Sequence, residues 1–215
     1  MSENIVVVDY KIGNIFSVCN ALKHIGFSPV LSSDPNVIKK ADRLILPGVG
    51  SFGSAMKNIR SNGHDESIFS FISTGRPFLG ICIGMQVLMD ISYELGEHKG
   101  LSLIKGSVIR IPHTNIDGSN LSVPHIAWSK VSSRGNHYSL PLNCPSYDIG
   151  LQYYYFIHSY MCMPLTSDCV YAHFEYGGHL LNAAIGHDNI IGVQFHPERS
   201  GHAGLAFLNR LISGS

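Results

Sequence analysis

Residues 80–86 constrain the fold more than any other stretch of the chain. They read Gly-Ile-Cys-Ile-Gly-Met-Gln, so Cys82 has a glycine two residues to either side. The apolar residues 77–79 predict a buried strand before it, and residues 85–91 predict a buried helix after it. A sharp strand-to-helix turn strains its central residue and needs neighbours without side chains, an arrangement called a nucleophile elbow. The stretch predicts such an elbow, although a buried structural cysteine between two unrelated glycines explains it equally well.

The first half of the chain alternates strand and helix patterns. Short apolar runs read as buried strands, and the segments between them look helical. This alternation predicts an α/β fold with a doubly wound, mostly parallel sheet, in which ligands bind at the carboxyl ends of the strands. The loops expected at those ends are residues 9–14, 47–51 and the elbow. The expected strands are 5–8, 29–31, 44–46 and 78–81, and the expected helices are 15–25, 51–60 and 64–73.

The second half of the chain is rich in strand patterns and ends in a helix. Its short apolar runs, separated by turn signals such as Gly177-Gly178, predict an antiparallel extension of the sheet. Residues 132–150 are rich in Ser, Pro, Asn and Gly and predict a surface loop. A length of 215 residues suits one domain, residues 1–215. The expected strands are 107–111, 122–131, 153–158, 169–174, 180–185 and 190–193, and the last helix is 203–212.

Charge and cysteine content exclude several classes of protein. With 15 basic and 15 acidic residues the chain is neutral, so there is no electrostatic case for binding nucleic acid or an anionic membrane. No apolar stretch approaches the roughly 18 residues of a membrane span, and the N-terminus lacks the basic region of a signal peptide. The 5 cysteines form no C-x-x-C pair, and the 12 histidines show no metal-ligand spacing. We expect reduced thiols, a cytoplasmic location, and neither metal nor cofactor.

A cysteine nucleophile needs a base, and His196 is the strongest candidate. It follows the apolar run 190–193, so it stands at the same edge of the predicted sheet as Cys82. In an extended chain residues two apart face the same side, so Glu198 can reach the far imidazole nitrogen, fix its tautomer and stabilise imidazolium. The alternative is a surface histidine followed by an exposed glutamate. We expect a catalytic triad of Cys82, His196 and Glu198.

Acyl transfer also needs hydrogen-bond donors for the oxyanion. The backbone N–H of Ile83 is one, and the loop containing Val49 and Gly50 can supply another, because glycines let backbone N–H groups approach a ligand closely. An ordinary strand-to-helix turn explains that loop about as well. Gln86 lies one helical turn after Cys82 and can face the pocket, although a solvent-exposed position is commoner for such a residue.

Three segments together resemble a known family. Residues 47–50 (Pro-Gly-Val-Gly), 80–86, and 194–198 (Gln-Phe-His-Pro-Glu), in this order and spacing along the whole chain, resemble class I glutamine amidotransferases. Within that class the chain is similar to the glutaminase subunits of imidazole glycerol phosphate synthases. The closer resemblance also rests on residues 9–10, 13–14, 17–18, 51–56, 96–101, 124–128 and 154–160.

This resemblance implies a flavodoxin-like domain, a reaction and a partner. Cys82 attacks the side-chain amide carbon of L-glutamine, and His196, oriented by Glu198, passes the proton to the leaving ammonia. Water then hydrolyses the glutamyl thioester. The ammonia passes to a separate (β/α)₈-barrel synthase subunit, and the complex acts as a lyase in histidine biosynthesis. The substrate contacts that the resemblance implies are Gly50, Gln86, His158, Ser159 and Tyr160.

Two departures from the family leave the recipient of the ammonia open. Lys11 stands where the family usually has glycine, and residues 124–129 read Pro-His-Ile-Ala-Trp-Ser in place of the usual Pro-His-Met-Gly-Trp-Asn. An offshoot that supplies ammonia to enzymes making acetamidino sugars for surface polysaccharides is therefore the first alternative. A cysteine peptidase or γ-glutamyl hydrolase could use the same elbow and base. A non-catalytic binding module is disfavoured, because nucleophile, base and orienting acid are all present.

Overall fold

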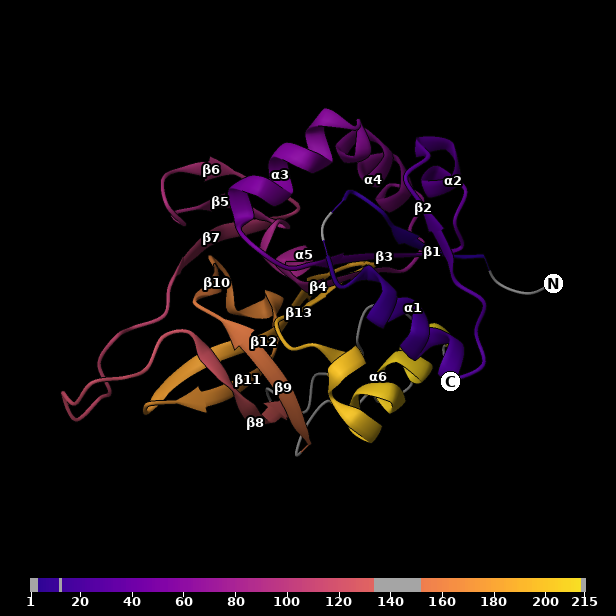
Figure 1. Cartoon of the computed structure of the whole chain (residues 1–215). Coiled ribbons are helices and arrows are strands. Elements are labelled where there is room, and N and C mark those ends of the chain that lie inside the picture. The colour runs from indigo at the N-terminus through magenta and orange to yellow at the C-terminus, as the bar shows by residue number, and fades with distance from the viewer. Residues whose placement is uncertain (1–3, 12, 134–151, 214–215) are drawn as a thin grey trace.

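The computed structural model, which describes residues 4–11, 13–133 and 152–213, has a nine-stranded sheet at its centre in these residues (Figure 1). The strand order is β2-β1-β3-β4-β13-β12-β11-β8-β9. Pairing is parallel from β2 to β13 and antiparallel from β13 to β9, which confirms the doubly wound α/β sheet with an antiparallel extension. The strands are β1 (Ile5–Val8), β2 (Val30–Ser32), β3 (Arg43–Gly48), β4 (Phe78–Cys82), β8 (His125–Ser133), β9 (Tyr153–His158), β11 (Val170–Tyr176), β12 (His179–His187) and β13 (Ile190–Val193).

Helices cover both faces of the parallel half. Helices α2, α3 and α4 lie on one face, and α1 and α6 lie together on the other (Figure 1). Their apolar residues recur at helical spacing and are buried against the sheet, as Ile15, Val18 and Leu22 are in α1. The short α2 was not predicted; Asp34 caps it by accepting a hydrogen bond from the N–H of Asn36. The bounds are α1 (Ile15–His24), α2 (Pro35–Lys39), α3 (Phe52–Ser61), α4 (His64–Ile72) and α6 (Gly201–Ser213).

The buried helix expected over residues 85–91 is wrong. The helix after the elbow, α5 (Ile83–Gln86), is a single turn, and the chain then enters strand β5 (Met89–Ser92). β5 joins a second sheet of order β10-β7-β5-β6. An apolar run fits a buried strand as well as a buried helix, and here pairing with β7, in which Met89 faces Ile104, decides for the strand. The other strands are β6 (His98–Lys99), β7 (Ile104–Arg110) and β10 (Tyr160–Pro164), and two 3₁₀ turns are η1 (Ser167–Cys169) and η2 (Pro197–Arg199).

Three further expectations about the second half need correction. The run 107–111 belongs to the second sheet, because β7 pairs with β5 and β10. The run 190–193 is not antiparallel to both of its neighbours, since β13 is inserted beside β4 in parallel and pairs antiparallel only with β12. Of the predicted surface loop, residues 132–133 end strand β8, and residues 134–150 lie outside the described residues.

Strand register brings the carboxyl ends of β3, β4 and β13 together. Gly48 at the end of β3 is paired with Cys82 at the end of β4, and Val193 at the end of β13 is paired with Ile81. The loops after these strands therefore lie side by side. This register places the loop after β3, the elbow and the segment containing His196 at one edge of the sheet, as ligand binding in doubly wound folds requires.

Candidate functional site

The strained turn at Cys82 is the first feature of the site. Cys82 ends β4 and directly precedes α5, with φ 55° and ψ −107°, a conformation that L residues rarely adopt. Strain of this kind costs of order 1–3 kcal/mol and is concentrated at functional sites. A Cβ on Gly80 would lie 2.4 Å from the carbonyl oxygen of Gly84, so the turn closes only with glycine there. The predicted strand–turn–helix geometry is present, with Cys82 at its tip.

His196 and Glu198 form a buried pair after β13. His196 Nδ1 lies 2.8 Å from Glu198 Oε1, and both side chains are almost completely buried, so the alternative of a surface histidine and an exposed glutamate is wrong. Residues 197–199 form the 3₁₀ turn η2, not the extended chain we expected, and this turn makes the contact possible. Because a carboxylate oxygen only accepts, Nδ1 carries the hydrogen and Nε2 is the basic nitrogen.

The charge state of His196 depends on both of its neighbours. Burial disfavours the imidazolium, but the Cys82 sulfur and the Glu198 carboxylate outweigh it and raise the pKa of His196. Nε2 has no partner of ordinary hydrogen-bond geometry in the described part of the chain. The sulfur nevertheless stabilises the protonated ring, so Cys82 and His196 are electrostatically coupled.

Asn14 is a site residue to which the sequence analysis gave no role. Its side-chain Nδ2 donates to Glu198 Oε1 at 2.6 Å, across 184 residues of sequence. It sits in the first loop, between β1 and α1, with φ 72°. Two signals could have found it: the position of this loop at the carboxyl end of β1, and asparagine's tolerance of positive φ.

The loop after β3 is held against the elbow by a buried tyrosine. The Tyr10 hydroxyl donates to the Pro47 carbonyl at 2.7 Å, and burial raises the Tyr10 pKa, so this donor stays neutral. A Cβ on Gly48 would lie 2.5 Å from the Tyr10 hydroxyl oxygen and 2.8 Å from Ile83 Cβ. The next residue, Val49, lines the same pocket as Cys82 and Ile83, and its role in an oxyanion hole stays a prediction.

A chain of amide hydrogen bonds connects Gln86 to the sulfur. Gln86 Nε2 donates to Tyr160 O and to Gln194 Oε1, both at 3.0 Å, and Gln194 Nε2 donates to Cys82 Sγ at 3.6 Å. Gln86 is buried and lines the pocket, so the solvent-exposed alternative is wrong. Gln194 belongs to the motif of residues 194–198, but its position in the sequence did not predict this contact with Cys82.

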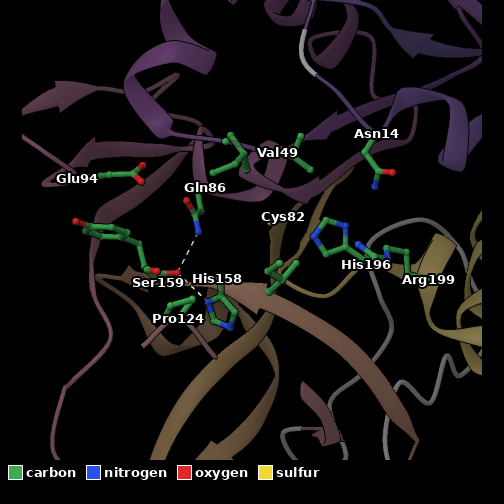
Figure 2. Close-up of a pocket in the computed structure, with 14 residues that line it drawn as sticks. Asn14, Val49, Cys82, Gln86, Glu94, Pro124, His158, Ser159, His196 and Arg199 are labelled. Carbon is green, nitrogen blue, oxygen red and sulfur yellow. Dashed lines mark hydrogen bonds between the residues drawn. The ribbon is translucent and has the colours of Figure 1, made fainter. Parts of the chain in front are cut away.

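His158 is a neutral member of the pocket wall. Its Nδ1 lies 2.9 Å from Tyr160 O, the same oxygen that accepts from Gln86, as the dashed lines in Figure 2 show. Burial lowers the pKa of His158 to about 3, while the hydrogen bond to Tyr160 opposes the shift. The ring is therefore uncharged near neutral pH, with Nδ1 as donor.

A pocket of about 410 Å³ joins these groups. Figure 2 shows Asn14, His196 and Arg199 on one side of Cys82, with Gln86 and Glu94 on the other. Every predicted site residue except Glu198, which lies behind His196, lines this pocket. Two charged lining residues were missed, because no motif marks them. Arg199 packs over the Tyr155 ring at 4.7 Å, and Glu94 Oε2 accepts from the Phe52 N–H at 2.6 Å. The lining residues are Asn14, Val49, Gly50, Cys82, Ile83, Gln86, Glu94, Pro124, Ile157, His158, Ser159, Tyr160, His196 and Arg199.

The described ranges contain neither a metal-binding cluster nor a membrane-spanning helix. Within residues 4–11, 13–133 and 152–213, no group of three or more His, Cys, Asp or Glu side chains could hold a metal ion. No helix in the same ranges is long and apolar enough to cross a membrane.

Comparison with known proteins identifies the family of this chain. The family model "Glutamine amidotransferase class-I" matches residues 6–211. "Imidazole glycerol phosphate synthase subunit HisH 1" of Legionella pneumophila (strain Paris) is 38% identical over 98% of this chain and 99% of its own. "Imidazole glycerol phosphate synthase subunit HisH" of Geobacillus thermodenitrificans is 41% identical over 96% of this chain and 93% of its own.

Solved structures agree on the fold. The "Structure of PurLQS from Thermotoga maritima" superposes with a TM-score of 0.73 at 19% identity, covering 99% of both chains. The "Crystal structure of glutamine amidotransferase" has a TM-score of 0.71 at 19% identity, covering 98% of this chain and 99% of that one. With the family match over nearly the whole length, the result is plain: the chain belongs to the class I glutamine amidotransferase family.

Proposed function

We propose that this chain is the glutaminase subunit of an imidazole glycerol phosphate synthase. It hydrolyses L-glutamine to glutamate and ammonia, and the ammonia goes to a partner subunit for histidine biosynthesis. The observation that carries the proposal is a strained cysteine that lines one pocket together with His196, which is paired with the buried Glu198. Full-length relatives at about 40% identity carry the name of this subunit, which favours histidine biosynthesis over sugar amidination.

The proposed reaction has two acyl-transfer steps. His196 Nε2 takes the thiol proton of Cys82, and the sulfur attacks the amide carbon of glutamine. Backbone N–H groups at Ile83 and in the loop of Val49 and Gly50 stabilise the resulting oxyanion. The C–N bond breaks, and the imidazolium protonates the departing ammonia. His196 then deprotonates a water that attacks the thioester, and the second oxyanion collapses to glutamate while the thiol regains its proton.

The pocket walls suit a free amino acid. Glu94 is the one acidic side chain among the lining residues that the structure describes, so we propose that it pairs with the α-ammonium of glutamine. The proposed contacts of the remaining substrate atoms are Gly50, Gln86, His158, Ser159 and Tyr160, all of which line the pocket. Contacts to both α-substituents would favour free glutamine over a peptide and so support a glutaminase over a peptidase.

An apolar stripe beside the pocket is the proposed docking surface for the (β/α)₈-barrel partner. It consists of Ile126 and Trp128 on β8 with Ile157 on β9, which are 55%, 52% and 36% exposed. Ile126 is paired with Ile157, and Ile157 also lines the pocket, so the stripe is continuous with the pocket mouth. Ammonia that leaves this mouth would enter a subunit seated there without crossing bulk solvent.

Two further points belong to the same proposal. The whole chain, residues 1–215, acts as one glutamine amidotransferase domain; a continuous buried core and the family match over residues 6–211 support this. The protein works in the cytoplasm, where thiols such as Cys82 stay reduced; cell fractionation would test this.

The test is an assay of glutamate and ammonia release from glutamine, with and without the barrel subunit. Activity that needs Cys82 and rises with the barrel subunit is expected. With the barrel and its phosphoribulosyl-formimino ribotide substrate, imidazole glycerol phosphate should form. Complementation of a histidine auxotroph lacking its glutaminase subunit distinguishes histidine biosynthesis from sugar amidination. Cleavage of peptides or of γ-glutamyl peptides without ammonia release would instead identify a peptidase or γ-glutamyl hydrolase.

A further inference from the structure

We propose that Asn14 is a positioning residue of the triad, which holds the Glu198 carboxylate in register with His196. The inference rests on the proposed function, since it concerns the same reaction. Asn14 Nδ2 donates at 2.6 Å to Glu198 Oε1, and this is the oxygen that accepts from His196 Nδ1 at 2.8 Å. Both hydrogen bonds therefore fix one oxygen atom.

The second carboxylate oxygen of Glu198 makes no hydrogen bond to the described residues that could hold the carboxylate in place. Glu198 Oε2 is buried and has no hydrogen-bond partner in the part of the chain that the structure describes. A carboxylate held only by His196 could rotate about its side-chain bonds and lose the Nδ1 contact. The Asn14 amide prevents that rotation, because its hydrogen bond holds the same oxygen atom from a second direction.

The position and backbone conformation of Asn14 indicate that its side chain does more than cap helix α1. Asn14 precedes α1, where asparagine commonly accepts a hydrogen bond from the helix N-terminus, but its side chain makes no such bond. With φ 72° it adopts a conformation that asparagine tolerates better than most residues. The side chain is turned instead towards Glu198, which lies in the turn η2 after β13.

Three variants test the proposal in the holoenzyme with its partner subunit. Asn14→Gly removes the amide without adding strain at positive φ, and we expect kcat to fall roughly ten- to a hundred-fold, the factor for one hydrogen bond to a charged group, with KM little changed. Asn14→Asp places two carboxyls at this contact, where only one ionises readily. Its activity relative to wild type should fall as pH rises, because the protonated carboxyl that can donate is lost.

The third variant is the double substitution Asn14→Gly/Glu198→Gln. If Asn14 acts through the Glu198 carboxylate, the two losses of activity are not additive. We therefore expect the kcat of the double variant to lie close to that of Glu198→Gln alone. Lys11→Gly is the control, because Lys11 lies in the same loop at φ 63° and is exposed. It should keep kcat and the shape of the pH profile.

The outcomes separate this inference from the proposed function. If Cys82→Ser still releases ammonia, the proposed function fails. If Cys82→Ser is inactive while Asn14→Gly keeps kcat within twofold and an unchanged pH profile, only the role of Asn14 is overturned. A purely structural role would lower the thermal midpoint, leave the pH profile unchanged and make the two losses of activity in the double variant additive. Should Asn14→Gly not fold, Asn14→Asp, which has the same shape, decides through its pH profile.

Discussion

Gly84 lies against Leu46 so closely that a Cβ on Gly84 would sit 1.8 Å from the Leu46 carbonyl oxygen. This contact joins the first turn of α5 to strand β3. Because β3 leads into the loop of Val49 and Gly50, the contact fixes the distance between the candidate nucleophile and the candidate oxyanion loop. The second glycine of the motif is therefore required by packing between two segments of the chain, and not only by the turn itself.

Gly84→Ala should destabilise the protein by about 2 kcal/mol or more, because a backbone carbonyl cannot move away as a flexible side chain can. Urea unfolding followed by circular dichroism measures the change. Gly13→Ala is the matched control, since a Cβ there would make an ordinary contact of 3.6 Å with Val49. Equal unfolding free energies for the two variants would contradict the packing argument.

The strained backbone at Cys82 predicts an unusual order of stabilities. Cys82→Gly should be more stable than Cys82→Ala by about 1 kcal/mol, because φ 55° suits glycine and strains alanine. At Cys19, inside α1, the order should be reversed by about the same amount, because glycine weakens a helix interior. Thermal unfolding of the four variants measures both differences. The strain is absent if alanine is the more stable substitution at both cysteines.

The triad predicts graded losses of activity. Cys82→Ser should abolish glutamine hydrolysis and leave the fold intact, and His196→Asn should lower kcat by about 10²–10⁴, the usual contribution of a general base. Glu198→Gln should be milder, because only orientation and charge stabilisation are lost. Since the Glu198 charge helps to raise the pKa of His196, its removal should shift the limb of the kcat/KM profile that reports His196 to lower pH. An unchanged profile and wild-type activity in Glu198→Gln would exclude Glu198 from the triad.

The parts of the site that were predictable are those whose chemistry restricts residue type locally. The turn at Cys82, the loop at Gly50 and the His196–Glu198 pair each come after an expected strand, and parallel pairing brings the ends of these strands together. Asn14 and Gln194 could not be assigned in this way. Asn14 meets Glu198 across 184 residues, so its role depends on where two distant loops meet.

The fold also has parts that could be predicted from local sequence and parts that could not. Strands buried on both faces were found from their apolar runs, as in β1 and β13. The helix prediction for residues 85–91 was wrong because their apolar pattern suits a helix and a strand alike. Pairing of Met89–Ser92 with β7 and β6 determines that this segment is a strand. Pairing partners outside the local sequence are not visible in apolar periodicity, which is why the second sheet was missed.

Burial of His158 predicts acid sensitivity of the fold. Its pKa is about 3 in the folded protein and about 6.5 when unfolded, so above pH 6.5 both states are neutral and it adds no pH dependence. Between those values only the unfolded chain binds the proton, and the free energy of unfolding falls by up to about 1.4 kcal/mol per pH unit as pH drops. His158→Gln should lessen this slope between pH 6 and 4, measured by urea titrations. His187→Gln, at an exposed position, should not. Parallel slopes for wild type and His158→Gln would contradict the prediction.

The apolar stripe beside the pocket predicts where the proposed barrel subunit binds. Trp128 packs near Tyr155, with ring centroids 6.1 Å apart, so it is a preorganised aromatic anchor beside Ile126 and Ile157. Trp128→Ala should weaken binding of the barrel subunit by about 2 kcal/mol, roughly thirtyfold in Kd, as expected for an interface hot spot. Titration calorimetry with the purified barrel measures this. Phe69→Ala on α4, which removes an exposed aromatic side chain from a helix on the other side of the molecule, is the control and should leave Kd unchanged. Wild-type affinity in Trp128→Ala would place the docking surface elsewhere.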